Sequence, residues 1–317
     1  MKTAYQYKEV CLLPRYSTLK TRQRAEVSTT FLGSRFKLPV VPSNMVCVIN
    51  ETHAQWLSEH GYFYIMHRFG VDNLEFVRGA QDWKTISISV GVQETDKYLL
   101  EQIAAEDLRV DYVTIDIAHG DSILMKEMLG HISLLSLDAK IIAGNVCTPE
   151  GYRHLAEWGA DAVKVGIGGG GVCSTKNKTG FTFPMYSCIA EIEQRRELDD
   201  PPIVADGGIR EHADIVKALH AGAEMVMIGG LFSRCIDSPA EVLDGQKVYF
   251  GSASQYNKGE YRNVEGIKRT LDLDTMTYAE KLLEIEQDLQ SAVSYAGGRN
   301  ILDISMSEAR LVMNWEA

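Results

Sequence analysis

One cysteine lies in an unusual polar loop of the sequence. Cys173 follows an apolar run and four consecutive glycines at 168–171, and a stretch rich in serine, threonine and lysine comes after it. A free cysteine usually packs as a small apolar residue in a core, but this loop offers little apolar surface. An exposed thiol close to Lys176 and Lys178 is expected to react as a thiolate. Cys173 is therefore a candidate nucleophile, and Thr175 is placed to relay a proton unless it only forms a turn.

Two glycine pairs follow apolar runs that are expected to be strands. Asp206-Gly207-Gly208 precedes a helix predicted to begin near Arg210, and Gly229-Gly230 follows the last run. Glycine lets the backbone approach an anion, and a helix N-terminus supplies free N–H donors. Together the pairs predict a phosphate site, although either alone could be a tight turn. The Asp206 carboxylate would repel phosphate, so it is expected to accept hydrogen bonds from a ribose diol or else to cap the helix.

A polar segment at 249–266 follows the last expected strand. Its small residues and mixed charges are unlike those of a core, so it is expected to be a mobile flap that closes over a substrate. Arg262 and Glu265 are its candidate functional side chains, although such residues in a polar loop are more often solvated.

Two smaller groups of polar residues are also candidates. Asp116 and His119 end an apolar run at one edge, where His119 is either a base or a rim histidine with no chemical role. Near the N-terminus, Lys20, Arg22 and Arg24, with Thr21, form a small basic cluster. This cluster could bind a phosphate of the same chain or of a neighbouring subunit, or it could be a solvated face.

The elements that must position these residues follow from eight short apolar runs. These lie at 38–41, 62–66, 85–90, 111–116, 140–144, 162–166, 202–206 and 225–229. Continuous apolar runs are typical of parallel strands buried on both faces. Segments of helical character lie between them, including 51–60, 95–105, 149–158, 184–195 and 210–220. Eight alternating units predict an α/β fold, a closed (β/α)8 TIM barrel, in which polar loops gather where the strands end.

We expect a single domain over residues 1–317, because no low-complexity linker interrupts the chain. An N-terminal extension at 1–36 precedes the barrel. The flap at about 249–266 and an amphipathic C-terminal helix at about 278–296 follow it.

The alternative fold is an open, doubly wound sheet. Gly166, Gly168 and Gly171 match the spacing of a dinucleotide fingerprint. That fingerprint requires a helix to begin in the loop, whereas the stretch after Cys173 has no helical period. The barrel is therefore favoured.

Composition excludes several classes of protein. The 317 residues are 45% hydrophobic and 24% charged, as in a soluble globular protein, and the net charge of −11 gives no basic footprint for nucleic acid. No apolar run is long enough to span a membrane and the start lacks a secretory signal, so we expect a cytoplasmic protein. The six cysteines are far apart, which disfavours a zinc site or disulfides and predicts reduced thiols.

Matching segments in one order make the chain similar, almost end to end, to the family of IMP dehydrogenases and GMP reductases. These segments are 40–45 (VVPSNM), 116–120 (DIAHG), 143–151 (AGNVCTPEG), 164–180 (KVGIGGGGVCSTKNKTG), 205–209 (ADGGI), 227–230 (MIGG), 250–254 (FGSAS) and 265–266 (EG). Within the family the chain looks like the reductases. The early strands leave no room for the regulatory insertion usual in the dehydrogenases, and only ten residues separate Ser254 from Glu265. A dehydrogenase without the insertion is the alternative.

The resemblance implies that GMP and NADPH give IMP and ammonia through a covalent thioimidate on Cys173, with Thr175 and Glu265 in proton transfer. It implies substrate contacts by Asp206, Gly207, Gly208, Gly229, Gly230, Gly251, Ser252, Arg262, Asn263, Glu265 and Gly266. It implies NADPH contacts by Thr21, Arg22, Arg68, Asp116, Ile117, Ala118, Ile167, Gly168, Tyr261, Arg262, Ser294, Tyr295, Ala296 and Gly297. It further implies a homotetramer, with some of these contacts crossing a subunit interface, and a monovalent cation such as K⁺ on carbonyls of Gly168, Gly170, Cys173 and Lys176.

The sequence departs from the family in the loop before the cysteine. The family commonly has Gly-Pro-Gly-Ser there, whereas Gly169 and Gly171 stand here for the proline and the serine. A run of glycines costs more backbone entropy to order, and one hydroxyl that could contact phosphate is missing. Lys176 stands where many relatives have arginine. Two readings from other classes stay open: a flavin-dependent phosphate-binding barrel and a non-catalytic purine-nucleotide-binding barrel.

Overall fold

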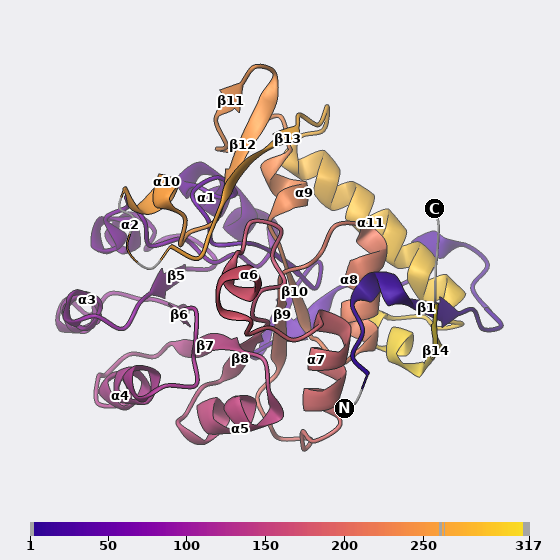
Figure 1. Ribbon diagram of the computed structural model, residues 1–317, viewed down its shortest axis with the longest axis horizontal. Helices are drawn as coiled ribbons and strands as arrows, with labels where there is room; N and C mark the ends of the chain where they lie inside the picture. Colours follow the sequence, from indigo (N-terminus) through magenta and orange to yellow (C-terminus); the bar gives the residue numbers. More distant parts are fainter. Residues whose placement is uncertain (1–2, 260–261, 263, 313–317) are drawn as a thin grey trace.

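The computed structural model describes residues 3–259, 262 and 264–312. Seven parallel strands form its central sheet in the order β4-β10-β9-β8-β7-β6-β5 (Figure 1). They are β4 (Val40–Pro42), β5 (Ser87–Val90), β6 (Tyr112–Asp116), β7 (Lys140–Val146), β8 (Ala162–Val165), β9 (Ile203–Asp206) and β10 (Met225–Ile228). The segment 62–66 adds a single parallel bridge, from Met66 to Ile88 in β5.

Side chains from opposite parts of this sheet meet inside it. Val41 of β4, together with Phe63 and Ile65, packs in one buried cluster with Ile142 of β7 and Met227 of β10. These contacts require the sheet to curve until its two edges approach each other. The predicted (β/α)8 barrel is confirmed, with 62–66 as the eighth segment of its wall.

A short hairpin closes the N-terminal end of the barrel. Its strands are β2 (Thr29–Phe31) and β3 (Ser34–Phe36). The Phe31 ring lies 5.3 Å from that of Phe63, and the Phe36 ring lies 6.3 Å from that of Tyr112, the first residue of β6. The hairpin thus fills the barrel at the starts of the strands and leaves their carboxyl ends for a site.

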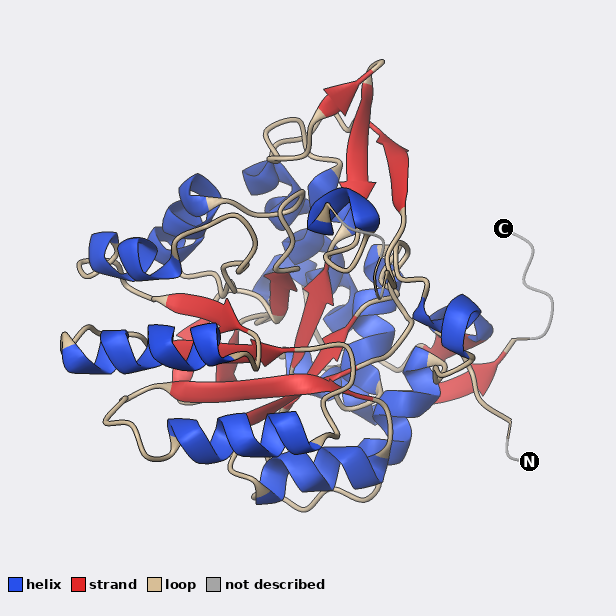
Figure 2. Ribbon diagram, turned by 60° about the vertical axis from the view of Figure 1, so that its left-hand side comes forward, coloured by secondary structure: helices blue, strands red, loops and turns tan. Residues whose placement is uncertain are grey.

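Helices surround the barrel, as Figures 1 and 2 show. They are α1 (Glu51–His60), α2 (Asn73–Gly79), α3 (Glu94–Ala105), α4 (Ile123–Ile132), α5 (Pro149–Glu157), α7 (Met185–Glu193) and α8 (His212–His220). Their first residues follow from N-caps: Asn50 and Thr148 each accept a backbone N–H of the first turn, and Pro149 begins α5. The five helices predicted from sequence are confirmed to within two residues at either end. In the described part of the chain, no helix is long and apolar enough to cross a membrane.

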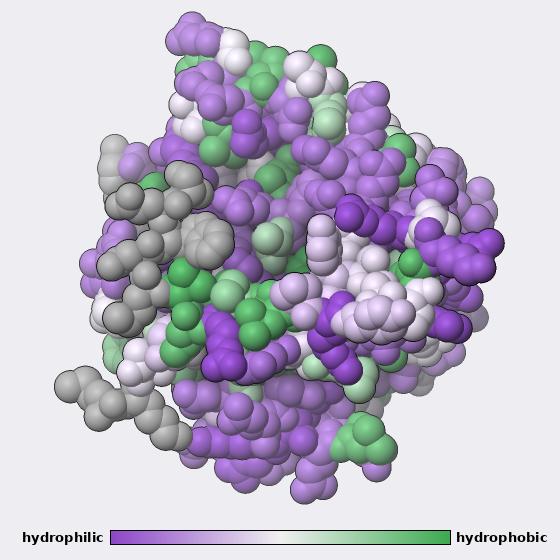
Figure 3. All heavy atoms as spheres, turned by 90° about the vertical axis from the view of Figure 1, so that its right-hand side faces the viewer, coloured by the Kyte–Doolittle hydropathy of each residue, from purple (hydrophilic) through white to green (hydrophobic). Residues whose placement is uncertain are grey.

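The two ends of the chain pack side by side. Strands β1 (Val10–Leu13) and β14 (Glu308–Leu311) pair antiparallel, and the 3₁₀ turns η1 (Tyr7–Glu9), η2 (Arg22–Arg24) and η3 (Ile301–Met306) flank them. Helix α11 (Tyr278–Tyr295) buries the apolar stripe expected of the C-terminal helix, which confirms it. Figure 3 views this side of the molecule, where hydrophilic residues predominate and apolar ones gather in patches.

A small antiparallel sheet stands beside the open end of the barrel (Figures 1 and 2). It consists of β11 (Val242–Leu243), β12 (Gln246–Phe250) and β13 (Lys268–Asp272), with helix α10 (Gln255–Lys258) between the last two strands. The segment expected to be a flap therefore begins within β12 and contains a helical turn. The predicted site residues Tyr261 and Asn263 lie outside the described residues.

Candidate active site

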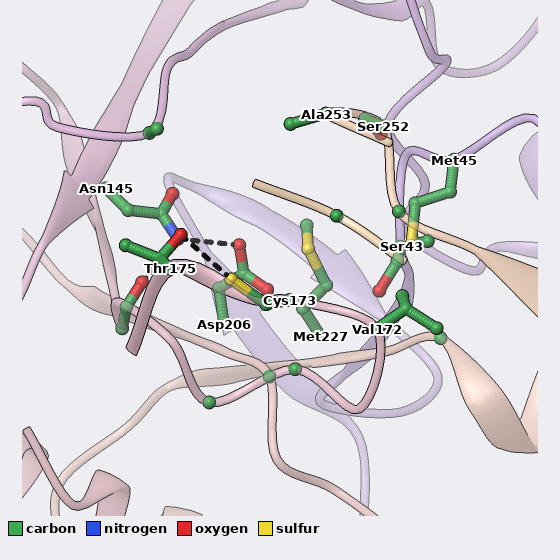
Figure 4. Close-up of a pocket in the computed structure, with 18 of the residues that line it drawn as sticks. Ser43, Met45, Asn145, Val172, Cys173, Thr175, Asp206, Met227, Ser252 and Ala253 are labelled. Carbon is green, nitrogen blue, oxygen red and sulfur yellow. Dashed lines mark hydrogen bonds between the residues drawn. The ribbon is translucent and has the colours of Figure 1, made fainter. Parts of the chain in front are cut away.

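A cavity of about 380 Å³ opens at the carboxyl ends of the barrel strands (Figure 4). Most of the residues singled out in the sequence line it. These are Arg68, Asp116, Ile117, Ala118, Ile167, Gly168, Gly170, Cys173, Thr175, Asp206, Gly207, Gly208, Gly229, Gly230, Gly251, Ser252, Glu265 and Gly266. The fold thus brings loops from most of the barrel and from the flap segment to one place.

A series of hydrogen bonds connects the three predicted catalytic residues. The Cys173 thiol donates to Thr175 Oγ1 at 3.2 Å, and the Thr175 hydroxyl donates to Glu265 Oε2 at 2.6 Å. The backbone fixes this arrangement, because Ser174 N–H donates to the Glu265 carbonyl and Cys173 forms a bridge with Gly266. Thr175 and Glu265, 90 positions apart in the sequence, are therefore held within hydrogen-bond distance of each other.

Cys173 differs from the other five cysteines in lining this cavity. Burial raises the pKa of Cys47 to about 11 and that of Cys235 to about 12, and it also raises the pKa of Cys147 and Cys188. Cys173 is half-buried and lines the cavity.

The expected lysine neighbours of the thiol are not its partners. Lys178 directs its ammonium to the carbonyl of Val264, and Lys176 is exposed. Thr175 begins a short helix, α6 (Thr175–Thr179), where the sequence predicted none. Five polar residues are too few to reveal a helical period, and the turn ends at Gly180, which is left-handed at φ 79°. The hydrogen-bond partner of the thiol is therefore the Thr175 hydroxyl, which in turn contacts the Glu265 carboxylate.

The glycine pairs form a cradle around the cavity. Gly207 and Gly208 have φ angles of 96° and 86°, and a Cβ at Gly207 would lie 2.9 Å from the backbone N of Gly170. A side chain at Gly229 would collide with the hydroxyl of Tyr249. Conformation thus requires glycine at Gly208, space requires it at Gly229, and both require it at Gly207.

The N-terminus of helix α8 lies away from this cavity within the chain. The helix begins at His212, and His212 and Ala213 line a separate cavity beside α11. Asp214 in its first turn accepts from the N–H groups of Arg210 and Glu211, as in a capping box. The short helix α9 (Gly230–Ser233) instead begins at the cavity wall, so backbone donors there come from glycine loops.

A buried lysine joins two carboxylates on the floor of the cavity. Lys164, only 2% exposed, contacts Asp116 Oδ1 at 2.9 Å and Asp206 Oδ2. Burial alone would raise the pKa of Asp116, but the Lys164 ammonium lowers it. Burial alone would lower the pKa of Lys164, and the two carboxylates raise it. Asp116 is therefore ionised at neutral pH, and the shared ammonium fixes the orientation of both carboxylates.

Two asparagines complete this group. Asn145 Nδ2 donates to Asp206 Oδ2 at 2.8 Å, and Asn44 Nδ2 donates to Asp116 Oδ2 at 2.9 Å. Sequence reasoning assigned no role to Lys164, Asn44 or Asn145. The available signal was a lysine between Val163 and Val165 in a strand expected to be buried on both faces.

Several predicted residues lie away from the cavity within this chain. Arg22 donates to Ser291 Oγ at 3.3 Å and stacks 5.2 Å from the Tyr295 ring centroid, at the end of α11. Thr21, Ser294, Ala296 and Gly297 belong to the same neighbourhood, and Tyr295 and Ala296 line a second cavity of about 600 Å³. Arg262 and His119 are exposed and do not line the first cavity.

The loop offers carbonyls and no acidic cluster for a cation. Among the residues that the structure describes, no group of His, Cys, Asp or Glu could hold a metal. The carbonyls of Gly170 and Lys176 each accept one backbone N–H, from Cys173 and Gly180. Each carbonyl oxygen has a second lone pair. The predicted carbonyl ligands could therefore still coordinate a monovalent cation.

The chain belongs to the family described as IMP dehydrogenase / GMP reductase domain, whose model matches residues 4–314. It is thereby assigned to a family of oxidoreductases.

Within that family, similar curated proteins are named GMP reductase. One from Paracidovorax citrulli (strain AAC00-1) is 45% identical over 305 residues, which cover 95% of this chain and 93% of the relative. Another from Variovorax paradoxus (strain S110) has the same identity and coverage. A third from Staphylococcus carnosus (strain TM300) is 45% identical over 316 residues, covering 98% of this chain and 97% of that protein.

Proposed function

We propose that this chain is a GMP reductase, which converts GMP and NADPH to IMP, ammonia and NADP. The observation that carries the proposal is the hydrogen-bonded series of Cys173, Thr175 and Glu265 at the wall of a glycine-lined cavity. Displacement of an amino group from a nucleotide base needs a nucleophile, a proton path and a cradle for phosphate. The names of the relatives support the choice of substrate.

In the first step Cys173 Sγ attacks C2 of the purine. The S–H proton passes through the Thr175 hydroxyl to the Glu265 carboxylate, the direction in which the hydrogen bonds run. Glu265 then gives this proton to the departing amino group, which leaves as ammonia. A thioimidate remains on Cys173, so two moderate steps replace one difficult displacement.

The NADPH side of the cavity is formed by Arg68, Asp116, Ile117, Ala118, Ile167 and Gly168. Arg68 Nε is buried without a hydrogen-bond partner among the described residues, which fits an anionic ligand. When bound, NADPH supplies the hydride that replaces sulfur on C2. Cys173 leaves as a thiolate and takes up the one proton that the overall reaction consumes.

On the substrate side, Asp206 is proposed to accept the ribose hydroxyls. Lys164 and Asn145 hold its carboxylate, and Asn145 Oδ1 is a buried acceptor without a partner in the described structure. The phosphate is proposed to lie on Gly207, Gly208, Gly229 and Gly230.

Four further features complete the proposal. The protein is proposed to act in the cytoplasm as a homotetramer of single-domain chains without a regulatory insertion. Tyr295 and its neighbours would then meet cofactor bound to an adjacent subunit. A K⁺ ion is proposed on the carbonyls of Gly168, Gly170, Cys173 and Lys176.

A four-way assay tests the reaction class. We expect GMP to oxidise NADPH, with loss of reduced-cofactor absorbance, and IMP to leave NAD and NADP unchanged. Formation of NADH from IMP and NAD, without any reaction of GMP, would instead identify a dehydrogenase that lacks the insertion.

Removal of the proton path should slow catalysis without loss of binding. Thr175→Val and Glu265→Gln are each expected to lower kcat about 100-fold, because the thiol then has no hydroxyl or carboxylate to receive its proton. GMP affinity, measured by calorimetry, should change little. Thr179→Val, on the same short helix but with its hydroxyl on the Thr175 carbonyl, is the control. An equal loss of kcat in that control would contradict a role in proton transfer.

A further inference from the structure

The guanidinium of Arg269 occupies the space beside Gly171 in the cysteine loop. A Cβ at Gly171 would lie 2.8 Å from Arg269 Nη2 and 3.3 Å from Cζ. Gly171 is not among the glycines with positive φ. Space and not backbone conformation therefore favours glycine here, because a side chain at this position would collide with the arginine.

Arg269 is held over a residue of the cavity wall. It lies on β13 opposite Tyr249 of β12, and its guanidinium lies 5.6 Å from the centre of the Tyr249 ring. Stacking of this kind restrains an arginine without neutralising it. Tyr249 lines the cavity, and its hydroxyl abuts Gly229. The two side chains thus extend from Gly171 to the glycine cradle.

The cations near the cavity differ in how they are engaged. Lys164 is bound to Asp116 and Asp206, Arg68 reaches the carbonyl of Asp116, and Lys258 lines the cavity from the flap segment. Arg269 adjoins two residues of the cavity wall, Gly171 and Tyr249, and has no carboxylate partner among the described residues. A nearby cation strengthens the binding of a phosphate dianion, and a guanidinium binds phosphate through two parallel hydrogen bonds.

We propose that Arg269 binds the 5′-phosphate of the nucleotide. Its guanidinium occupies the space that glycine at position 171 leaves open. The inference rests on the proposed function only in requiring a nucleoside monophosphate as ligand. It also gives a reason for one departure of this loop from the family pattern. Where relatives commonly have serine, this chain has glycine together with a guanidinium from β13.

Calorimetry with nucleotides and nucleosides tests the assignment. Arg269→Met is expected to weaken GMP binding about tenfold to 100-fold and to leave guanosine binding unchanged. Arg269→Lys keeps the positive charge but not the paired hydrogen bonds of a guanidinium, so its loss of GMP affinity should be smaller. Gly171→Ser should also weaken GMP binding, because its side chain displaces the guanidinium. Lys268→Met removes the neighbouring charge, which lies over the Tyr256 ring instead, and should change neither affinity.

An unchanged ratio of GMP to guanosine affinity in Arg269→Met would overturn the assignment, as would a wild type that binds no nucleotide. Thermal melting establishes that each variant is folded, and Arg269→Lys decides the matter if Arg269→Met does not fold. The same titrations with IMP and inosine separate this inference from the proposed reaction. If IMP binding depends on Arg269 in a protein that does not reduce GMP, the phosphate site is supported and the proposed reductase activity is contradicted.

Discussion

Cys173→Ala is expected to lower turnover of GMP by about 10⁴-fold or more, because Cys173 is the one cysteine among the described residues that line the cavity and its thiolate forms the bond to C2 in the proposed reaction. The variant should fold normally, since the half-buried thiol makes a single side-chain hydrogen bond, to Thr175. GMP should still bind with an affinity within a few fold of the wild type. The loss should therefore appear in kcat and not in calorimetric affinity.

Cys11→Ala is the matched control. Cys11 is also half-buried, but it lies on β1 against the second cavity, far from the barrel opening in the fold. We expect this variant to keep full activity. Substantial turnover by Cys173→Ala would remove Cys173 as the nucleophile and, with it, the thioimidate.

Lys164→Met is expected to have the second largest effect, on stability as well as on activity. The substitution leaves two buried carboxylates without their shared cation, which typically costs about 3–5 kcal/mol. Without the ammonium, burial should raise the pKa of Asp116 above its unfolded value. A raised carboxyl pKa contributes stability at low pH that is lost as pH rises. The melting temperature should thus fall further below that of the wild type at pH 8 than at pH 5.

Lys247→Met provides the control for loss of a buried lysine. Lys247 is also 2% exposed, but its ammonium donates to the carbonyls of Ile236, Ser238 and Ala240. Its loss should destabilise the protein with little dependence on pH in this range. Asp116→Asn combined with Lys164→Met should recover part of the stability. A loss of stability in Lys164→Met that does not change with pH would contradict an ionised Asp116 held by Lys164.

The barrel and the nucleophile loop could be predicted from sequence because their signals are local. Buried strands appear as apolar runs, and a run of glycines and polar residues after such a strand marks a loop. The contact of Glu265 with Thr175 came from the resemblance, since 90 intervening residues carry no distance information.

What could not be predicted depends on tertiary pairing. Lys164 lies in an apolar strand, and only the closed barrel shows that its ammonium meets Asp206 of the neighbouring strand β9 and Asp116 of β6, two strands away. The N-terminus of α8 was assigned to phosphate because glycines precede its first turn, but His212 and Ala213 at that end line the second cavity. Arg269 looks like a solvated charge on an exposed strand until β13 is placed beside Gly171.

The transfer of hydride to C2 is the central claim, and isotope labelling tests it most directly. NADPH that carries deuterium at the transferable nicotinamide position is incubated with GMP and the protein, and the purine product is analysed by mass spectrometry and NMR. We predict IMP with deuterium on C2, formed in equal amount with ammonia and NADP. An unlabelled product, or ammonia released without oxidation of the cofactor, would contradict reductive deamination by this chain.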